Sequence, residues 1–360
     1  MDVKAKKIAV LCDYELLPTR VGGMDYFFWL FDKKCKENSI EVDWFFPNNS
    51  AHGEYSKLKI IESNYENVAH FFTDYILKNQ VNYSTIITHF VEVCSPIFKK
   101  MKQSSNAKII VVDHNPRPID GYSFRKKLEK KVKGFLYSRY IDLFVGVSNY
   151  SKNQLIKEFG SQIEKKSIVI FNGSDSKKFK QKEQFTSNTN FVIACHLRKD
   201  KGIQDVIAVV NQLKLEIQIP FTITIYGEGL YEPELKQKIA AASLQDFFIF
   251  KGSISNLHEI YCNYDYLIHP SHGETFCYTV VESLMSNLPV ITNNQGNVLG
   301  LITNKTNGFL YNDHEINDLK NILKGVLNNE IKVENGLMKD SKVANLSLDK
   351  MVDTYFQTIN

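Results

Sequence analysis

The sequence has no apolar run long enough to cross a membrane or to act as a secretory signal. Its first apolar run, Ile8–Leu11, follows three lysines and is cut off by Asp13, far below the length that either segment needs. The better interpretation of residues 6–12 is a first β-strand. We therefore expect a cytoplasmic protein.

Cysteine pairs are absent and arginine is scarce. The cysteines are scattered without a CxxC pair, which favours reduced, mostly buried thiols. Only five of the 44 basic residues are arginines, and the formal net charge is only +4. Because arginine supplies the forked hydrogen bonds that read bases, these features argue against a nucleic-acid partner. The cysteines are Cys12, Cys35, Cys94, Cys195, Cys262 and Cys277.

Two ligand motifs are also missing. No G-x-G-x-x-G fingerprint of a dinucleotide site follows a strand, and no Asp-x-Asp pair stands at a strand end where it could hold a metal ion. We expect neither a metal site nor a bound cofactor.

Apolar segments that alternate with helical patterns fill the chain from end to end. Strands that are apolar throughout and alternate with helices predict parallel sheets covered on both faces, with ligands beyond the carboxyl ends of the strands. At 360 residues the chain is long enough for two such α/β domains, each with its own core. The expected strands are 6–12, 41–46, 84–90, 108–113, 142–147 and 167–171, and then 190–195, 221–226, 247–251, 264–268, 288–292 and 307–311.

Two carboxylates, Glu274 and Glu282, lie eight residues apart in a stretch that reads as strand, polar turn and amphipathic helix. On a helix this spacing turns both side chains to one side. A helix start offers free backbone N–H groups to a phosphate, and the two carboxylates could accept hydrogen bonds from sugar hydroxyls beside it. The spacing also has an explanation without a ligand: Glu274 is a carboxylate at the helix start, and Glu282 is a carboxylate that faces solvent.

The stretch GETFCYTVVESLMSNLPVI resembles the E-x7-E signature of glycosyltransferase family four, retaining enzymes with the GT-B fold. It departs from that signature at Cys277, where glycine is usual, and at Ser283 and Asn287. The resemblance implies two facing Rossmann-like doubly wound domains, a cleft between them and a C-terminal helix that returns to the first domain. We expect domains at 1–178 and 187–340, with that helix in 341–360.

Other landmarks of the family follow in order. NGSDSKKF resembles the end of the first domain. In CHLRKDKG, Lys201 matches the family's lysine, while His196 stands where arginine is usual and Arg198 is the candidate replacement. Two cations beyond a strand end could hold a diphosphate and stabilise its charge on departure. An ordinary charged loop is the alternative. Phe250-Lys251-Gly252 resembles the segment that faces the base.

In the first half, Gly22-Gly23 and His114 are the candidates. A glycine pair between strand and helix lets the backbone approach a ligand closely, although a plain turn explains it equally well. His114 follows a strand and precedes a loop with two prolines, so it is either a loop histidine or a substrate contact. The resemblance favours the contact. Asp113 and Asn115 are lesser candidates.

The resemblance implies a role for each candidate. Glu274 would contact the donor sugar, Glu282 the ribose, and His114 the transferred sugar. Arg198, Lys201 and the segment Phe276-Cys277-Tyr278 would hold the diphosphate. The expected reaction moves a sugar, from a UDP-sugar in the commonest case, to a hydroxyl with retention and without metal. An epimerase or hydrolase of the same fold, or a non-catalytic nucleotide-sugar-binding protein, remains open.

Residues 124–140 interleave basic and apolar side chains with near-helical spacing. Such a helix can lie on an anionic membrane, each near-surface cation contributing about 1 kcal/mol. A solvated helix packed on the sheet is the alternative. Membrane contact at the inner face would suit a lipid-linked acceptor in polysaccharide or glycolipid assembly. The cations are Arg125, Lys126, Lys127, Lys130, Lys131 and Lys133.

Overall fold

The computed structural model describes residues 6–18, 21–118, 121–183, 189–273, 275–298, 300–333, 343 and 345–360. It divides into two compact units. The first unit runs to Gly173 and takes in the C-terminal segment Ser347–Asn360, and the second is Ser174–Leu346. Residues 341, 342 and 344 of the expected C-terminal segment lie outside the described residues.

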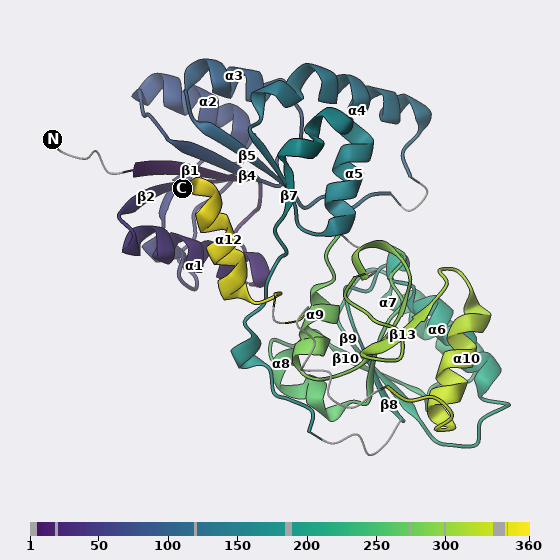
Figure 1. Cartoon of the computed structure of the whole chain (residues 1–360). Coiled ribbons are helices and arrows are strands. Elements are labelled where there is room, and N and C mark those ends of the chain that lie inside the picture. Colours follow the sequence, from purple (N-terminus) through teal and green to yellow (C-terminus); the bar gives the residue numbers. More distant parts are fainter. Residues whose placement is uncertain are drawn as a thin grey trace. The chain divides into compact units, whose positions relative to one another are not determined.

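Each unit is built on a parallel sheet (Figure 1). In the described part of the first unit the sheet has seven strands in the order β3-β2-β1-β4-β5-β6-β7. These strands are β1 (Lys6–Cys12), β2 (Ile40–Phe46), β3 (Lys59–Glu62), β4 (Thr85–His89), β5 (Lys108–Asp113), β6 (Leu143–Gly146) and β7 (Ser167–Val169). The helices are α1 (Gly23–Glu37), α2 (Val68–Asn79), α3 (Ile97–Ser104), α4 (Phe124–Tyr137), α5 (Asn149–Phe159) and α12 (Leu348–Ile359).

The described part of the second unit has a six-stranded sheet in the order β10-β9-β8-β11-β12-β13. Its strands are β8 (Asn190–Ala194), β9 (Thr222–Tyr226), β10 (Phe248–Gly252), β11 (Tyr266–His269), β12 (Val290–Asn293) and β13 (Gly308–Tyr311). Its helices are α6 (Ile203–Leu213), α7 (Glu232–Ala241), α8 (Leu257–Ile260), α9 (Tyr278–Met285) and α10 (Ile316–Leu327).

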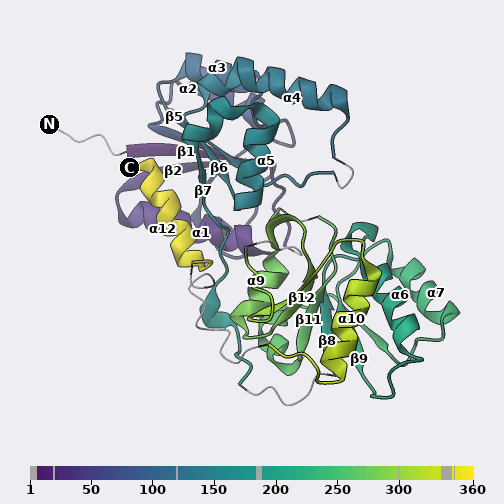
Figure 2. The same ribbon diagram turned by 45° about the vertical axis from the view of Figure 1, so that its right-hand side comes forward.

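The two doubly wound sheets predicted from the apolar alternation are confirmed. Every pairing between the strands that the structure describes is parallel. Side chains along the central strands are buried on both faces, as Ile8–Cys12 in β1 shows. In the first unit α1 and α12 cover one face and α2 and α3 the other (Figures 1 and 2). Both cores are therefore closed by helices, which leaves the strand ends for ligands.

The C-terminal helix belongs to the first unit, as expected from the family resemblance. α12 lies beside α1 in both views (Figures 1 and 2), and the rings of Phe27 and Tyr355 are 4.8 Å apart between centroids. Tyr355 is fully buried, and the backbone N–H of Gly173 donates to the sulfur of Met351 over 3.2 Å. Gly173, where the continuous part of the first unit ends, is thus hydrogen-bonded to α12.

Among the helices of the described residues, none has the length and apolar character needed to pass through a bilayer.

Candidate functional site

The loops at the carboxyl ends of β8 and β9 are held together by close backbone contacts. Leu197 N–H donates to the carbonyl of Glu228 over 2.9 Å. A Cβ on Gly227 would stand 1.9 Å from the carbonyl oxygen of Cys195, and a Cβ on Gly229 would stand 2.3 Å from that of Leu197. These positions require glycine because no side-chain atom fits between the two loops.

Lys201 and Arg198 follow β8 on one tight turn. Gly202 has φ +72°, and a Cβ on it would meet the carbonyl oxygen of Pro270 at 2.1 Å, so this turn is pressed against the end of β11. Lys201 is mostly buried, whereas Arg198 is exposed and forms a forked ion pair with Asp200, with N–O distances of 3.1 and 2.8 Å. A diphosphate would have to compete with Asp200 for Arg198. His196 is exposed next to them.

The helix of the E-x7-E stretch begins at the carboxyl end of β8, the strand that precedes these cations. α9 starts after Cys277, which makes no side-chain cap hydrogen bond, and Thr279 Oγ1 donates to the carbonyl of Ala194 over 3.2 Å. The helix start therefore lies against the carboxyl end of β8. The buried Phe276 packs edge-on against Tyr278, with 4.9 Å between ring centroids. Glu274 lies outside the described residues.

Glu282 is not the solvent-facing carboxylate of the explanation without a ligand. It is partly buried on α9, and burial raises its pKa to about 7, although the hydroxyl of Tyr261 at 3.5 Å acts in the opposite direction. Burial has removed water from this carboxyl group and so destabilises its ionised form. Hydroxyl groups of a ligand would stabilise that form by donating the hydrogen bonds that water no longer supplies. This environment suits a site for a polyol such as a ribose.

Lys251 occupies the far side of the same sheet end. It is exposed on β10, and the next residue, Gly252, accepts a hydrogen bond from the Gly227 N–H over 2.9 Å. Nearby, the hydroxyls of Tyr226 and Tyr264 are 2.9 Å apart. The described candidates of the second half thus follow β8, lie at the end of β10, or lie at and within α9, whose start contacts the carboxyl end of β8.

One residue of this region was not singled out by its sequence. His272 lies between two carboxylates, with Nε2 3.0 Å from Asp205 and Nδ1 2.8 Å from Asp313. Its backbone N–H donates to the carbonyl of Asp200 over 3.0 Å. The hydrogen bond to Asp205 is the largest of the effects that raise the pKa of His272 to about 9. A histidine in a polar turn carries no such signal in sequence, because its partners are distant in the chain.

In the first unit, His114 lies at the end of β5 and joins a second histidine at the end of β4. Its Nε2 is 2.9 Å from Nδ1 of the buried His89, and its ring stacks on Phe90 with 4.3 Å between centroids. Burial lowers the pKa of His114 to about 3. His114 is therefore neutral at physiological pH and can exchange hydrogen bonds with a hydroxyl, but it cannot serve as a charged acid.

Gly22 and Gly23 form the start of α1, beyond the carboxyl end of β1. The Gly22 N–H donates to Asp25 over 2.8 Å, and the same buried carboxylate accepts a hydrogen bond of 2.5 Å from the hydroxyl of Tyr55. Asp25 thus caps this helix and fixes the glycine loop. Gly22 has an ordinary negative φ of −141°, so its backbone conformation does not require glycine.

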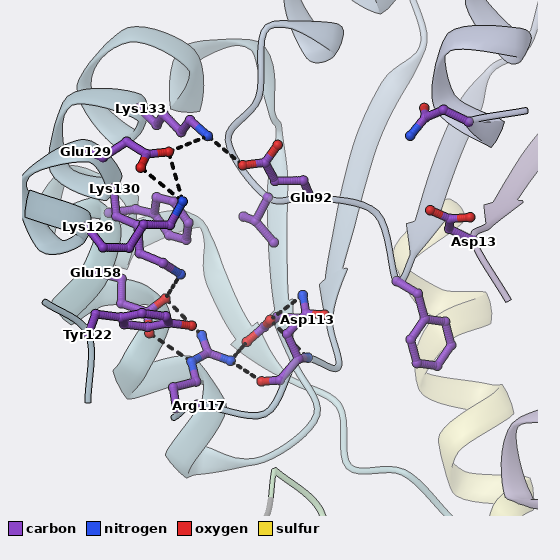
Figure 3. A pocket seen from close by; sticks show the side chains of 15 residues that line it. Asp13, Glu92, Asp113, Arg117, Tyr122, Lys126, Glu129, Lys130, Lys133 and Glu158 are labelled. Atoms are coloured by element: carbon purple, nitrogen blue, oxygen red, sulfur yellow. Dashed lines mark hydrogen bonds and ion pairs between the residues drawn. The ribbon is translucent and has the colours of Figure 1, made fainter. Parts of the chain in front are cut away.

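A pocket of about 390 Å³ opens beside His114's strand end, between the loops after β4 and β5 and the inner side of α4 (Figure 3). Arg117 crosses its floor and links two buried carboxylates, 2.6 Å from Asp113 and 2.8 Å from Glu158. Glu158 also accepts from Lys130 over 2.8 Å. Opposite charges are thus interleaved around a space that suits a hydroxyl-rich molecule.

The basic side chains of α4 separate into two sets. Lys126 and Lys133 both pair with Glu129 at 2.9 Å, and Lys130 pairs with Glu158, so these three point to the pocket (Figure 3). No ion pair joins the other three, all exposed, to any residue that the structure describes; they are Arg125, Lys127 and Lys131. The apolar residues are also exposed: Phe124 (83%), Leu128 (56%), Val132 (48%), Phe135 (70%) and Leu136 (42%). These five side chains of α4 are therefore turned to the outside and are not packed on the sheet.

Known proteins that resemble the chain are mostly glycosyltransferases. The family model described as glycosyl transferases group 1 matches residues 175–341. Among curated proteins, the chain is 33% identical over 103 residues to a Streptococcus gordonii UDP-N-acetylglucosamine–peptide N-acetylglucosaminyltransferase GtfA subunit, covering 28% of this chain and 20% of that protein. It is 28% identical over 208 residues to an alpha-monoglucosyldiacylglycerol synthase of Streptococcus pneumoniae, covering 51% of this chain and 44% of that protein. The chain thus spans less than half the length of both relatives.

Solved structures extend the likeness to nearly the whole chain. The apo lipopolysaccharide outer core galactosyltransferase WaaB matches with a TM-score of 0.76 at 17% identity, covering 98% of this chain and 99% of that one. HepE from Anabaena in complex with UDP matches with a TM-score of 0.74 at 18% identity, with the same two coverages. At such low identity these structures bear on the fold alone. The second half of the chain thus matches the glycosyl transferases group 1 family model, and the chain as a whole has the GT-B fold.

Proposed function

We propose that the protein transfers a sugar from a nucleotide-sugar donor to a hydroxyl of a carbohydrate acceptor, with retention of the anomeric configuration. The observation that carries the proposal is the contact between the start of α9 and the carboxyl end of β8. The mostly buried Lys201 follows that strand, and α9 carries the partly buried Glu282. This combination offers groups for a diphosphate and for a ribose, and it coincides with the segment that matches the family model.

Within this proposal each group has one task. Lys201 and the N–H groups at the start of α9 hold the diphosphate and stabilise the negative charge it gains when the bond to the sugar breaks. Glu282 accepts hydrogen bonds from the ribose, and Glu274 contacts the donor sugar. His114 is neutral and meets a sugar hydroxyl. The cations perform the task that a metal would have, so we expect transfer to survive an excess of chelator.

UDP is the donor nucleotide that we propose, because the GtfA relative and the HepE complex are named for a UDP-sugar and for UDP. Binding of UDP is expected to strengthen about tenfold between pH 6 and pH 8, because Glu282 titrates at about 7 and only its ionised form accepts two hydroxyls. Calorimetric titration at several pH values measures this. In Glu282→Gln, binding at pH 8 should be weaker and the tenfold gain should disappear.

The fold of Glu282→Gln can be checked independently. Burial raises the pKa of Glu282 above its unfolded value, so the carboxyl contributes stability at low pH that is lost as the pH rises through about 7. The variant should therefore melt no lower than the wild type at pH 8. Equal pH dependence of UDP binding in both proteins would contradict the ribose role. Donor breakdown without an acceptor would identify a hydrolase instead of a transferase.

The pocket of the first unit is the proposed acceptor site. Its cations are already paired with carboxylates, which disfavours a second anionic group and favours sugar hydroxyls that hydrogen-bond to both kinds of side chain. The pocket lies on the inner side of α4, while the outer side of that helix exposes five apolar residues and three cations without ion pairs among the described residues. We propose that this outer side contacts an anionic membrane that carries the acceptor.

Membrane contact can be separated from the pocket because the two sets of cations are distinct. Replacing Arg125, Lys127 and Lys131 by Glu should weaken sedimentation with anionic vesicles by about 100-fold or more, since each near-surface cation contributes about 1 kcal/mol. Replacing Phe124 and Phe135 by Ser should also weaken it. The matched control is Lys236→Glu on the second unit, which should leave vesicle binding unchanged. Unaltered binding in the triple variant would refute the contact.

A further inference from the structure

His272 ties together the ends of four neighbouring elements in the second unit. It stands in the polar turn after β11, and its two ring nitrogens contact Asp205 at the start of α6 and Asp313 after β13. Asn293, the last residue of β12, donates to the carbonyl of Ser271 over 2.8 Å and to Asp313 over 3.0 Å. The His272 N–H also reaches the carbonyl of Asp200. The turn is therefore held by hydrogen bonds and ion pairs to α6, to β12, to a residue that follows β13 and to the turn of Asp200.

The imidazole can make both side-chain contacts as a donor only when it is protonated. A neutral imidazole has one N–H, so its second nitrogen would present a lone pair to one of the two carboxylates. Its surroundings favour the charged form: Asp205 and Asp313 lie at 3.0 and 2.8 Å, and the side chain is only 8% exposed. Among the described residues, the titratable groups that face it or its two partners are Asp205, Asp313, His314, Tyr311 and Tyr231.

The turn at His272 connects two segments that, in the proposed function, bind the sugar donor. One is the turn of Arg198 and Lys201, held through the Asp200 carbonyl. The other is the chain that continues from His272 toward Phe276 and the start of α9. We propose that His272 is a positioning residue, whose positive charge holds these two segments in the arrangement that binds the donor. The inference rests on the proposed function and adds to it a residue that does not itself touch the donor.

The steady-state test measures kcat and the KM for the donor between pH 7 and pH 10. In the wild type, kcat/KM should fall about tenfold per pH unit above pH 9, where His272 loses its proton. Glu282 is already ionised in this range, so it does not add to the decline. In His272→Gln, kcat/KM at pH 7.5 should be about 10- to 100-fold lower, the scale of misplaced binding groups, and the decline above pH 9 should be absent.

A second variant tests the charge without removing the ring. Asp313→Asn keeps the shape of the turn but removes one of the two negative partners, so the decline in kcat/KM should begin at a lower pH than in the wild type. A purely structural role would instead lower the melting temperature of His272→Gln and leave its kcat/KM, per folded molecule, within twofold of wild type. That result, or a decline unmoved in Asp313→Asn, would overturn the proposal.

Failure of the proposed function would show differently. A wild-type protein that binds no nucleotide and transfers no sugar would refute that function. The ring of His272, assigned by its loss in His272→Gln, can be titrated by NMR without any ligand. Titration below pH 7 in that experiment would overturn the inference by itself, and a midpoint near 9 that falls in Asp205→Asn would support it.

Discussion

Lys201→Met is expected to lower kcat/KM for sugar transfer by about 10²- to 10³-fold, the scale on which loss of one preorganised charge-stabilising group acts. Lys201 is mostly buried beside a turn that Gly202 presses against Pro270, so another side chain cannot move easily into its place. If its charge acts on the departing diphosphate, most of the loss should be in kcat. Initial rates at varied donor concentration measure both constants.

The matched control is Lys199→Met, two residues earlier in the same 3-10 turn and exposed to solvent. It should change kcat/KM by less than about threefold, because an exposed cation is screened by water and salt. Lys201→Arg should recover part of the activity, since it restores the charge with a different shape. Equal effects of the two methionine variants would contradict a specific role for Lys201.

Arg117→Ala should cost about 3–5 kcal/mol of unfolding free energy at pH 7.5, because it leaves the buried Asp113 without its cationic partner. Arg117, Asp113 and Glu158 are 7%, 2% and 7% exposed. Burial raises the pKa of Asp113, and Arg117 is the largest of the effects that lower it again. Removing the guanidinium therefore makes ionisation of Asp113 in the folded protein still more costly. Urea denaturation of both proteins measures the difference.

The pH dependence of this effect has a definite sign. A carboxyl whose folded pKa lies above its unfolded value gives stability below the unfolded pKa and loses it as the pH rises. The cost of Arg117→Ala should therefore shrink between pH 7.5 and pH 5. The control Arg125→Ala, on the exposed side of α4, should stay within about 0.5 kcal/mol at both values. A constant cost across this range would mean that lost packing, not charge, explains the change.

The sequence predicted the sheets well because the strands are buried on both faces. Every strand expected from an apolar run is present, within a few residues at each end. The structure also contains one strand that was not expected, β3. Its sequence KIIE has two charged ends and no fully buried side chain, because it lies at the edge of the sheet, beyond β2. An edge strand of four residues gives a periodicity signal too weak to separate from a loop.

The candidate site was predictable only where its contacts are local or resemble a known family. The spacing of Glu274 and Glu282 suggested that both lie on one side of a helix, but α9 begins only at Tyr278 and residues 275–277 are not helical. The spacing also gave no sign of the burial that raises the pKa of Glu282. His272 had no recognisable signal, because Asp205 and Asp313 come from other elements. The basic pattern of α4 was clear, and the pairing of Lys126 with Glu129 is local. The pairing of Lys130 with Glu158, and that of Lys133 with Glu92, depend on residues far away in sequence.

The position of α12 has a consequence for the order in which the chain folds. The first unit needs Leu348–Ile359 against α1, yet the whole second unit is synthesised between Gly173 and that helix. At about 5–20 residues per second, roughly 10–35 s pass before the ribosome delivers it. During this interval the surface of α1 that later covers Tyr355, including Phe27, has no helix over it. The first unit is thus translated first but completes its fold last. Because Phe27 lacks its cover until then, the incomplete first unit is the part of the chain that would need a chaperone.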